Sequence, residues 1–262
     1  MFVSEEKTVT TSNETNSRCT IEENSLPSLD ASGIAEYIRF DCCPRFFKLK
    51  FEGKELRKRT WLEAFKPISP LLYGIGKALE EKKAAELKEK AASYYDFNLY
   101  DPHANGWEKA RDSMNNLRNI IEAQISSEKA DSKPVLLYQV PMKGYIGIWE
   151  VKGIADLIAI WPLKNGKVNV RIFELKSSWK EQTAHRIQVA IYVLLLFQEL
   201  GALCSRVVLE GGVINRETAL TNLDAESLPK FKLSPLTQDV ERLLAENGEL
   251  NRIHKTSLEE VE

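Results

Sequence analysis

The chain has 262 residues, of which 43% are hydrophobic and 28% charged, and its net charge is −2. This composition excludes collagen-like, low-complexity and disulfide-dense proteins and predicts a globular fold with a sizeable core. The longest uninterrupted apolar stretch, Val189 to Phe197, is shorter than the roughly 20 residues of a membrane-spanning helix. The N-terminus lacks the basic start and apolar run of a secretory signal, so we expect a cytoplasmic protein with no membrane partner.

Charge is distributed unevenly along the chain. Residues 1–30 hold six acidic and two basic residues, whereas Arg39 to Thr60 hold eight basic and three acidic residues. No two cysteines have the C-x-x-C spacing of a zinc or redox site. In a reducing compartment we therefore expect free thiols at Cys19, Cys42, Cys43 and Cys204.

The first half of the chain is predicted to be helical after a disordered tail. Residues 1–29 are rich in Ser, Thr, Asn and Glu and cannot bury enough apolar surface to fold. Ser32 is the expected N-cap of a short helix that reaches the Cys-Pro break, and a second, basic helix covers Arg45 to Phe51. Helical spacing then predicts two long amphipathic helices, at Leu71 to Ala92 and at residues 105–128. The apolar stripe of the first of these is Leu72, Ile75, Leu79 and Leu87.

From Pro134 onward, β-branched and aromatic strands alternate with turns and helices. Strands are expected at VLLYQV, GYIGIWEV, GIADLIAIW and VNVRIFELKSS, with a loop at Pro162 to Lys167 before the last. A largely apolar helix follows at Glu181 to Leu200 and ends at Gly201. A strand at RVVLEGGVI and a final helix at DVERLLAEN, after Pro235, complete the order. This order indicates an α/β fold with a mixed central β-sheet flanked by helices.

Ionisable side chains occur within this predicted sheet. Asp156 lies in a strand that is otherwise apolar, and a buried carboxylate is costly unless it is paired, hydrogen-bonded or bound to metal. Because side chains alternate along a strand, Glu174 and Lys176 point to the same side. If the two strands form a hairpin, Asp156 approaches Glu174 at the strand ends, and two carboxylates and an amine surround one point.

This trio is suited to the hydrolysis of phosphodiester bonds. Mg²⁺ or Mn²⁺ takes oxygen ligands, which Asp156 and Glu174 supply, together with the backbone carbonyl of Leu175. The ion lowers the pKa of a bound water, and Lys176 orients or deprotonates that water. Spacing alone leaves an alternative open, in which Glu174 and Lys176 form a solvent-facing pair on an edge strand and Asp156 caps a turn.

The runs GIADLIAIW, FELKSS and AHRIQVAIYVLLL together resemble the nuclease core of the PD-(D/E)xK superfamily, and within it the RecB-type and CRISPR-associated RecB-like exonucleases. The motifs of that core match at Asp156, Glu174, Lys176, Gln188 and Tyr192. The resemblance implies a restriction-endonuclease-like core in which the Q-x-x-x-Y helix lies beside the active site and meets DNA. His185 shares nearly the same helix face as Gln188, so both are expected to contact DNA; the alternative is a polar stripe packed on the sheet.

Upstream segments extend the resemblance over roughly residues 31–245, and imply a single nuclease domain at 30–262. Its expected parts are mainly helical at 30–130, the sheet core with the active site at 134–216, and helical at 217–262. CCPRFFKLKFEG resembles the opening segment of the RecB-like nucleases, with the match at Cys43 to Phe47.

LLYGIGKALEEKK resembles the first core helix of these nucleases, in which a metal-binding histidine follows a glycine by four residues. Glu80 occupies that position here. Because glutamate is a suitable ligand of Mg²⁺ or Mn²⁺, Glu80 is a candidate ligand, with Glu81 as the register alternative. A solvated helix face is the other interpretation.

Many of these relatives hold a [4Fe–4S] cluster with one early cysteine and three near the C-terminus, and such a cluster needs four thiolates. No cysteine follows Cys204 in this chain, so no iron–sulfur cluster is expected. Either packing replaces the cluster, or the chain is a fragment of a longer protein.

The basic segment Arg39 to Arg59 is interleaved with aromatic residues and is suited to following a DNA backbone, with contacts from Arg45, Lys48 and Lys50. A solvated basic helix is the alternative. The resemblance, together with Asp156, Glu174 and Lys176, implies a Mg²⁺- or Mn²⁺-dependent deoxyribonuclease, an exonuclease or endonuclease that acts on single-stranded DNA or free ends. DNA repair or CRISPR adaptation, with protein partners, is the expected setting. The alternative is a weakly active or inactive nucleic-acid-binding module of such a complex.

Overall fold

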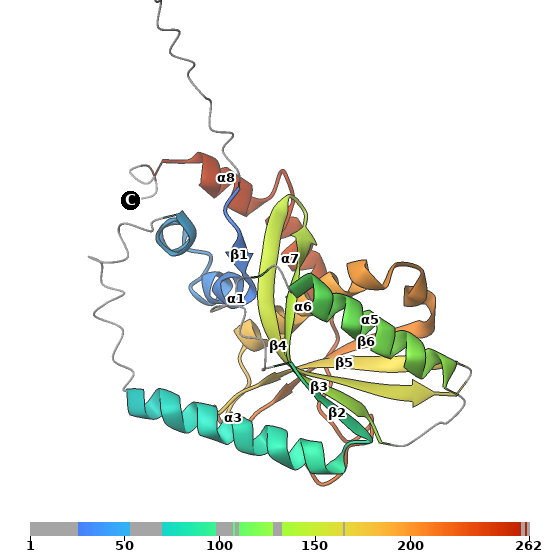
Figure 1. Ribbon diagram of the computed structural model, residues 1–262. Helices are drawn as coiled ribbons and strands as arrows, with labels where there is room; N and C mark the ends of the chain where they lie inside the picture. Colours follow the sequence, from blue (N-terminus) through green and yellow to red (C-terminus); the bar gives the residue numbers. More distant parts are fainter. Residues whose placement is uncertain are drawn as a thin grey trace, which may run out of the picture.

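A six-stranded mixed sheet is the centre of the fold (Figure 1). The computed structural model describes residues 26–52, 70–97, 107, 110–127, 133–164, 166–257 and 260. Neighbouring strands follow the order β2-β3-β4-β5-β6, and β1 pairs with β4. The β3–β4 and β4–β5 pairs are antiparallel, whereas β1–β4, β2–β3 and β5–β6 are parallel. The strands are β1 (Leu29–Asp30), β2 (Ser93–Asp96), β3 (Val135–Ile146), β4 (Trp149–Leu163), β5 (Lys167–Leu175) and β6 (Val207–Ile214).

Helices cover both faces of this sheet. One core contains buried residues of α1, α5, α6, α7 and α8, and a smaller core on the opposite face contains residues of α3 and of segment 220–228. Figure 1 accordingly shows α3 apart from the other helices. The helices are α1 (Ala31–Arg39), α2 (Pro44–Phe47), the π-helical η1 (Lys48–Glu52), α3 (Pro70–Lys90), α5 (Ala110–Ser126), α6 (Thr183–Leu200), the 3-10 helix η3 (Gly201–Arg206), α7 (Leu236–Leu244) and α8 (Glu249–Lys255).

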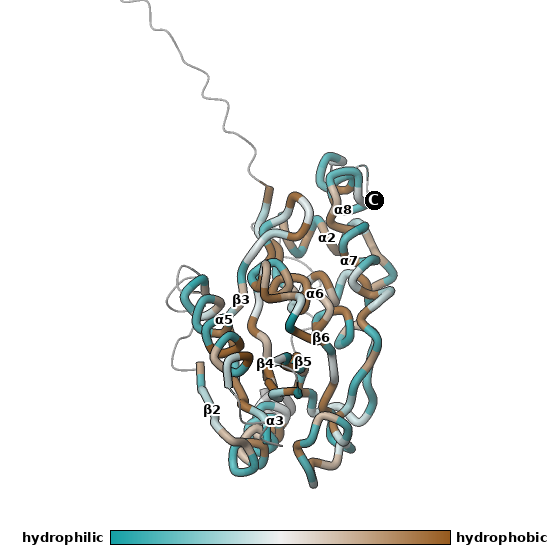
Figure 2. The backbone as a smooth tube through the Cα atoms, turned by 90° about the vertical axis from the view of Figure 1, so that its right-hand side faces the viewer, coloured by the Kyte–Doolittle hydropathy of each residue, from teal (hydrophilic) through white to brown (hydrophobic). Residues whose placement is uncertain are grey.

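The two-sided burial explains the apolar sequence of the central strands. Along β5, Val170 and Ile172 pack toward α6, whereas Phe173 and Leu175 pack toward α3. A strand that is covered on both faces has apolar residues at nearly every position. Figure 2 shows the hydrophobic segments concentrated on the strands and on α6.

The helix α6 connects the parallel strands β5 and β6 and lies in the core. Among the described residues, Thr183–Arg206 is the one segment long and apolar enough to cross a membrane, and 56% of its most apolar window is buried inside the fold. The expected end of the helix is confirmed, because Gly201 follows Leu200 with a φ of 52°. A core helix between a sheet and other helices has this composition without any membrane.

The start of the fold differs from the prediction. Leu29, placed in the disordered tail from composition, is fully buried and pairs with Val151 in β1, while residues 1–25 lie outside the described part. The N-cap of α1 is Asp30 rather than Ser32, because the Asp30 carboxylate accepts a hydrogen bond from the Gly33 N–H at 2.6 Å. The Ser32 hydroxyl donates to the same carboxylate at 2.7 Å.

Further differences concern the β3–β4 hairpin, α3 and two short elements. The run GYIGIWEV is the tip of the β3–β4 hairpin rather than one strand, because Gly147 turns the chain with a φ of 60°. Ile75 was expected on the buried stripe of α3, but its side chain is 48% exposed, while Leu87 is fully buried. The side chain of Leu72 lies outside the described part. The strand β2 and the helix α8 were not predicted.

Candidate active site

Asp156 and Glu174 lie opposite each other on adjacent strands. The antiparallel ladder pairs Leu157 with Phe173, so the next position brings Asp156 opposite Glu174. The Leu175 N–H donates a hydrogen bond to Asp156 Oδ2 at 2.8 Å. The prediction that these two carboxylates meet in a hairpin is therefore confirmed. Leu175, whose carbonyl was the expected metal ligand, contacts Asp156 through its N–H.

Glu174 is buried, with 1% of its side chain exposed. Its Oε1 atom lies 2.5 Å from Lys176 Nζ, whereas its Oε2 atom is buried and has no hydrogen-bond partner among the described residues. The expectation that Glu174 and Lys176 point to the same side is confirmed. The alternative of a solvent-facing pair on an edge strand is wrong, because β5 lies between β4 and β6.

The electrostatics of this cluster oppose the ionisation of both acids. Burial and the Asp156 carboxylate raise the pKa of Glu174 to about 8. Burial also raises the pKa of Asp156, although Lys176 and the Leu175 N–H act against this shift. Burial alone lowers the pKa of Lys176, but the Glu174 and Asp156 carboxylates raise it above its ordinary value. Lys176 is therefore an ammonium ion at neutral pH.

Gln139 on β3 holds Asp156 from the other side, with Nε2 donating to Asp156 Oδ1 at 3.1 Å. Gln139 has a φ of 53°, and the alternation of β3 changes there, since Leu137 and Val140 belong to the same core. Sequence reasoning missed Gln139, because glutamine does not mark a left-handed backbone position. The resulting irregularity turns an amide toward the site.

The helix α3 brings Glu80 within electrostatic reach of Asp156 and Lys176. Burial and Asp156 raise the pKa of Glu80, whereas Lys176 and a hydrogen bond from the Ser177 backbone lower it. A Cβ atom on Gly76 would lie 3.0 Å from Ser177 Oγ, so this glycine allows α3 to approach the residue after Lys176. Glu81 is exposed and pairs with Lys77 at 4.0 Å. Of the two registers, Glu80 is the one that faces the site.

The helix α6 places its polar residues beside the carboxylates. Gln188 Nε2 donates to Tyr192 Oη at 3.1 Å, and Tyr192 is 1% exposed. Burial and Glu174 raise the pKa of Tyr192. Burial and Lys176 lower the pKa of His185 to about 4, and its Nδ1 accepts a hydrogen bond from the Gln182 N–H at 3.2 Å. His185 is therefore a neutral imidazole next to the lysine.

The predicted DNA-binding lysines differ in their surroundings. Lys48 is 6% exposed and donates to Glu52 and to the His254 carbonyl, each at 2.7 Å, so it is a structural residue rather than a surface charge. Lys50 pairs with Glu36 at 3.4 Å, and Arg45 is exposed. Helical propensity predicted this segment as a helix but did not indicate which of its basic side chains point inward. The rest of the basic segment, residues 53–59, lies outside the described part.

The donor atoms fit a hard divalent cation. Among the described residues, no three His, Cys, Asp or Glu side chains come close enough to hold a metal ion, so Glu80 does not complete a three-ligand group with Asp156 and Glu174. Magnesium commonly needs only one or two carboxylates in addition to water and phosphate oxygens. The Oε2 atom of Glu174 offers an oxygen ligand of this kind. Cys42, Cys43 and Cys204 form no disulfide, and Cys19 lies outside the described residues.

The segments after β5 and β6 each contain a functional candidate that sequence reasoning missed. Trp179 is 57% exposed, and the Arg216 guanidinium lies 4.3 Å from the centre of its ring. The backbone also joins the two segments, because the Arg216 N–H donates to the Ser178 carbonyl at 3.2 Å. A tryptophan between polar residues, three positions after Lys176, is the sequence signal that would have indicated this position.

Comparisons with known proteins leave the family of this chain open. No protein-family profile and no curated protein matches the sequence. A solved structure described as "Crystal structure of SSO0001" matches with a TM-score of 0.20 and 15% identity, over 71% of this chain and 94% of that chain. This similarity is too low to support an inference about fold or function.

Proposed function

We propose that this chain is a metal-dependent nuclease with a restriction-endonuclease-like core that hydrolyses phosphodiester bonds in DNA. Glu174 carries this proposal. One of its oxygens is buried without a partner, a second carboxylate lies opposite it, and a lysine contacts its other oxygen. A buried polar atom without a partner destabilises a fold, and its presence is explained when a ligand completes its coordination.

Asp156 and Glu174 are the residues that would hold Mg²⁺ or Mn²⁺, with the Leu175 carbonyl as a further oxygen ligand. Glu80 is a neighbouring carboxylate that does not complete a three-ligand group with them in this structure. When bound there, the ion supplies an activated water and neutralises charge on the phosphate. The pKa values of Asp156 and Glu174 are raised in the metal-free chain because both carboxylates are buried. A bound cation would lower these pKa values by favouring the ionised forms, which agrees with a metal site.

Lys176 contributes a fixed positive charge. Since its pKa is raised, the ammonium stabilises negative charge that develops on the phosphate and donates hydrogen bonds that orient the attacking water. The Gln188–Tyr192 pair positions α6 against Glu174, and the neutral His185 is available as a hydrogen-bond partner of the substrate.

We infer a substrate of single-stranded DNA or free DNA ends, and a role in DNA repair or CRISPR adaptation in the cytoplasm with protein partners. The exposed Arg45 and the half-buried Lys50 remain candidates for contacts with the DNA backbone. Gln188 and His185 are the candidate contacts from α6.

The decisive experiment measures the cleavage of labelled single- and double-stranded DNA with Mg²⁺, Mn²⁺ or EDTA. Wild type is compared with Asp156→Asn, Lys176→Ala and Glu80→Gln, and Glu89→Gln on the exposed end of α3 serves as the control. We expect cleavage that requires metal and falls by about 100-fold or more in Asp156→Asn and Lys176→Ala, with Glu89→Gln unchanged.

The outcomes separate two classes of protein. If DNA binds but is never cut, the nuclease proposal is wrong and the chain is a nucleic-acid-binding module. If DNA is neither bound nor cut, both interpretations fail.

A further inference from the structure

A small cationic cavity lies next to the candidate active site, between α3 and the segment after β5. Its volume is about 180 Å³. Its polar lining consists of four basic residues, one acidic residue and one hydroxyl, although the whole chain has a net charge of −2. These residues are Lys82, Lys83, Lys176, Arg216, Glu86 and Ser177.

The cavity and the candidate site share Lys176 as a common wall. On α3, the lining residues Lys82, Lys83 and Glu86 follow helical spacing and form one face, while Glu80 belongs to the adjacent face that is turned toward Asp156. The Ser177 backbone contacts Glu80, and the Ser177 residue lines the cavity. A group bound in the cavity is therefore a direct neighbour of a group bound at Glu174.

Two of the cations are held in place before any ligand arrives. Lys83 Nζ donates to the Thr218 carbonyl at 2.9 Å. Arg216 is held by its contact with the Trp179 ring at 4.3 Å and by its backbone hydrogen bond to Ser178. Burial lowers the pKa of Lys83, so a bound anion would favour its charged form. Cations that are ordered in advance lose little entropy when an anion binds.

The size and chemistry of the cavity select its ligand. Pockets for drug-sized molecules have volumes of about 300–1,000 Å³, so a cavity of about 180 Å³ is too small for a base and its sugar. Lysine, arginine and serine side chains are the groups that bind phosphate oxygens in nucleic-acid complexes. An internal phosphate is joined to a nucleoside on each side, and such a group is too large for this cavity. A terminal phosphate has one ester link, so it enters the cavity while its nucleoside stays outside.

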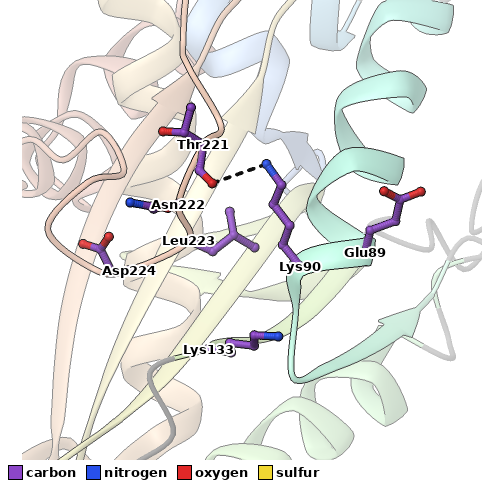
Figure 3. A pocket seen from close by; sticks show the side chains of 7 residues that line it. All are labelled: Glu89, Lys90, Lys133, Thr221, Asn222, Leu223 and Asp224. Carbon is purple, nitrogen blue, oxygen red and sulfur yellow. Dashed lines mark hydrogen bonds between the residues drawn. The ribbon is translucent and has the colours of Figure 1, made fainter.

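A second cavity, at the C-terminal end of α3, lacks these properties. It has a volume of about 420 Å³, and Figure 3 shows Lys90 directed at the backbone of Thr221. Lys90 Nζ donates to the carbonyls of Leu220 and Thr221, as Lys83 Nζ does to the Thr218 carbonyl, so the two cavities differ in charge rather than in the ordering of their lysines. The carboxylates of Glu89 and Asp224 offset the positive charges of Lys90 and Lys133. A cationic cavity is thus not a general property of this face.

We propose that the cavity lined by Lys82, Lys83 and Arg216 binds a terminal phosphate of the nucleic-acid substrate and so directs the candidate active site to strand ends. This inference rests on the proposed nuclease function and adds the substrate class, a phosphorylated end. The phosphodiester bond that is cut is then the one nearest to the phosphorylated end, and its hydrolysis by water releases the terminal nucleotide.

The test uses one single-stranded DNA oligonucleotide with an internal fluorophore, prepared with a 5′-phosphate, a 3′-phosphate or hydroxyls at both ends. Dissociation constants are measured by fluorescence anisotropy in EDTA, and cleavage rates with Mg²⁺ or Mn²⁺. Wild type is compared with Lys82→Gln, Lys83→Gln and the double variant. Lys88→Gln is the matched control, because Lys88 is an exposed lysine of the same helix outside the cavity.

We expect wild type to bind one of the phosphorylated oligonucleotides about tenfold more tightly than the hydroxyl form, which corresponds to one charge-assisted contact. Lys82→Gln and Lys83→Gln should reduce this ratio toward one, and Lys88→Gln should preserve it. Both variants should fold. Lys83→Gln keeps an amide donor for the Thr218 carbonyl, and Lys82 is exposed and makes no hydrogen bond or ion pair found among the described residues.

Two results would overturn the inference while the nuclease proposal stands: metal-dependent cleavage of all three oligonucleotides at equal rates, or a phosphate preference that survives in the double variant. Absence of both binding and cleavage in wild type would instead refute the proposed function itself.

Discussion

At the residue scale, the protonation of Glu174 links the candidate site to stability. Its pKa is about 8 in the folded chain, against an ordinary value of 4.5. Between these values the folded state retains a proton that the unfolded state releases, so stability falls as pH rises through this window. We expect the melting temperature of the metal-free protein to fall between pH 5 and pH 8, by roughly 2–4 °C for each kcal/mol, and Glu174→Gln to flatten this dependence.

Thermal denaturation in EDTA across that pH range provides the measurement, with Glu89→Gln as the control. Addition of Mg²⁺ should raise the melting temperature most at pH 8, because the cation binds the ionised carboxylates. A metal-free melting temperature that rises with pH over this interval would contradict the assignment.

Gly153 supplies a second prediction for a single residue. A Cβ atom there would lie 2.8 Å from Tyr192 Cε1 and 3.0 Å from the Ala31 Cβ. Gly153→Ala should therefore reduce the free energy of unfolding by about 1–3 kcal/mol through overpacking, and should slow cleavage because Tyr192 lies beside Glu174. Urea denaturation and the cleavage assay test both effects.

Gly74→Ala is the matched control, because the space around Gly74 is open and the residue is helical. This change should stabilise α3 by about 0.5–1 kcal/mol. Equal effects of the two substitutions would show that Tyr192 does not pack on Gly153 in solution.

At the scale of elements, the position of α3 determines whether Glu80 reaches the site. Leu87 is fully buried in the smaller core, whereas Ile75 on the same helix is 48% exposed. We expect Leu87→Ala to cost about 2–5 kcal/mol, to increase hydrogen exchange in α3 and to reduce cleavage. Ile75→Ala should leave the free energy of unfolding, the hydrogen exchange of α3 and the cleavage rate unchanged. Equal exchange in the two variants would contradict the packing of α3 on the sheet.

Periodicity and breakers predicted the strands β3 to β6 and the helices α5 and α6, because these elements bury long apolar patterns, and helical spacing predicted α3 although it buries few residues. The pair of Glu174 and Lys176 followed from strand alternation. The exposure of Ile75 could not be predicted from the sequence, because the apolar spacing of α3 is the same in its packed and exposed halves. Gln139 and the buried Lys48 depend on contacts distant in sequence, with Asp156 and with α8, and local patterns contain no signal for such partners.

At the scale of the whole molecule, Arg171 joins the sheet to segment 220–228. Its guanidinium is fully buried, contacts Glu210 and donates to the carbonyls of Leu228 at 2.9 Å and Ala225 at 2.7 Å. Arg171→Met should therefore reduce the free energy of unfolding by about 3–5 kcal/mol, since it leaves buried partners without a donor. Arg111→Met, at an exposed position of α5, is the control, and chemical denaturation distinguishes the two. Similar midpoints for both variants would contradict this role.

The contact between Lys48 and α8 has a consequence for biosynthesis. The His254 carbonyl that accepts from Lys48 lies 206 residues further along the chain, and the His254 ring also contacts Glu52 at 2.8 Å. A chain that emerges from the ribosome N-terminus first therefore exposes Lys48 and Glu52 long before these partners exist. The segment around η1 can reach its final packing only after α8 has been translated, so nascent chains that stop before Glu249 should remain sensitive to protease near residues 44–52.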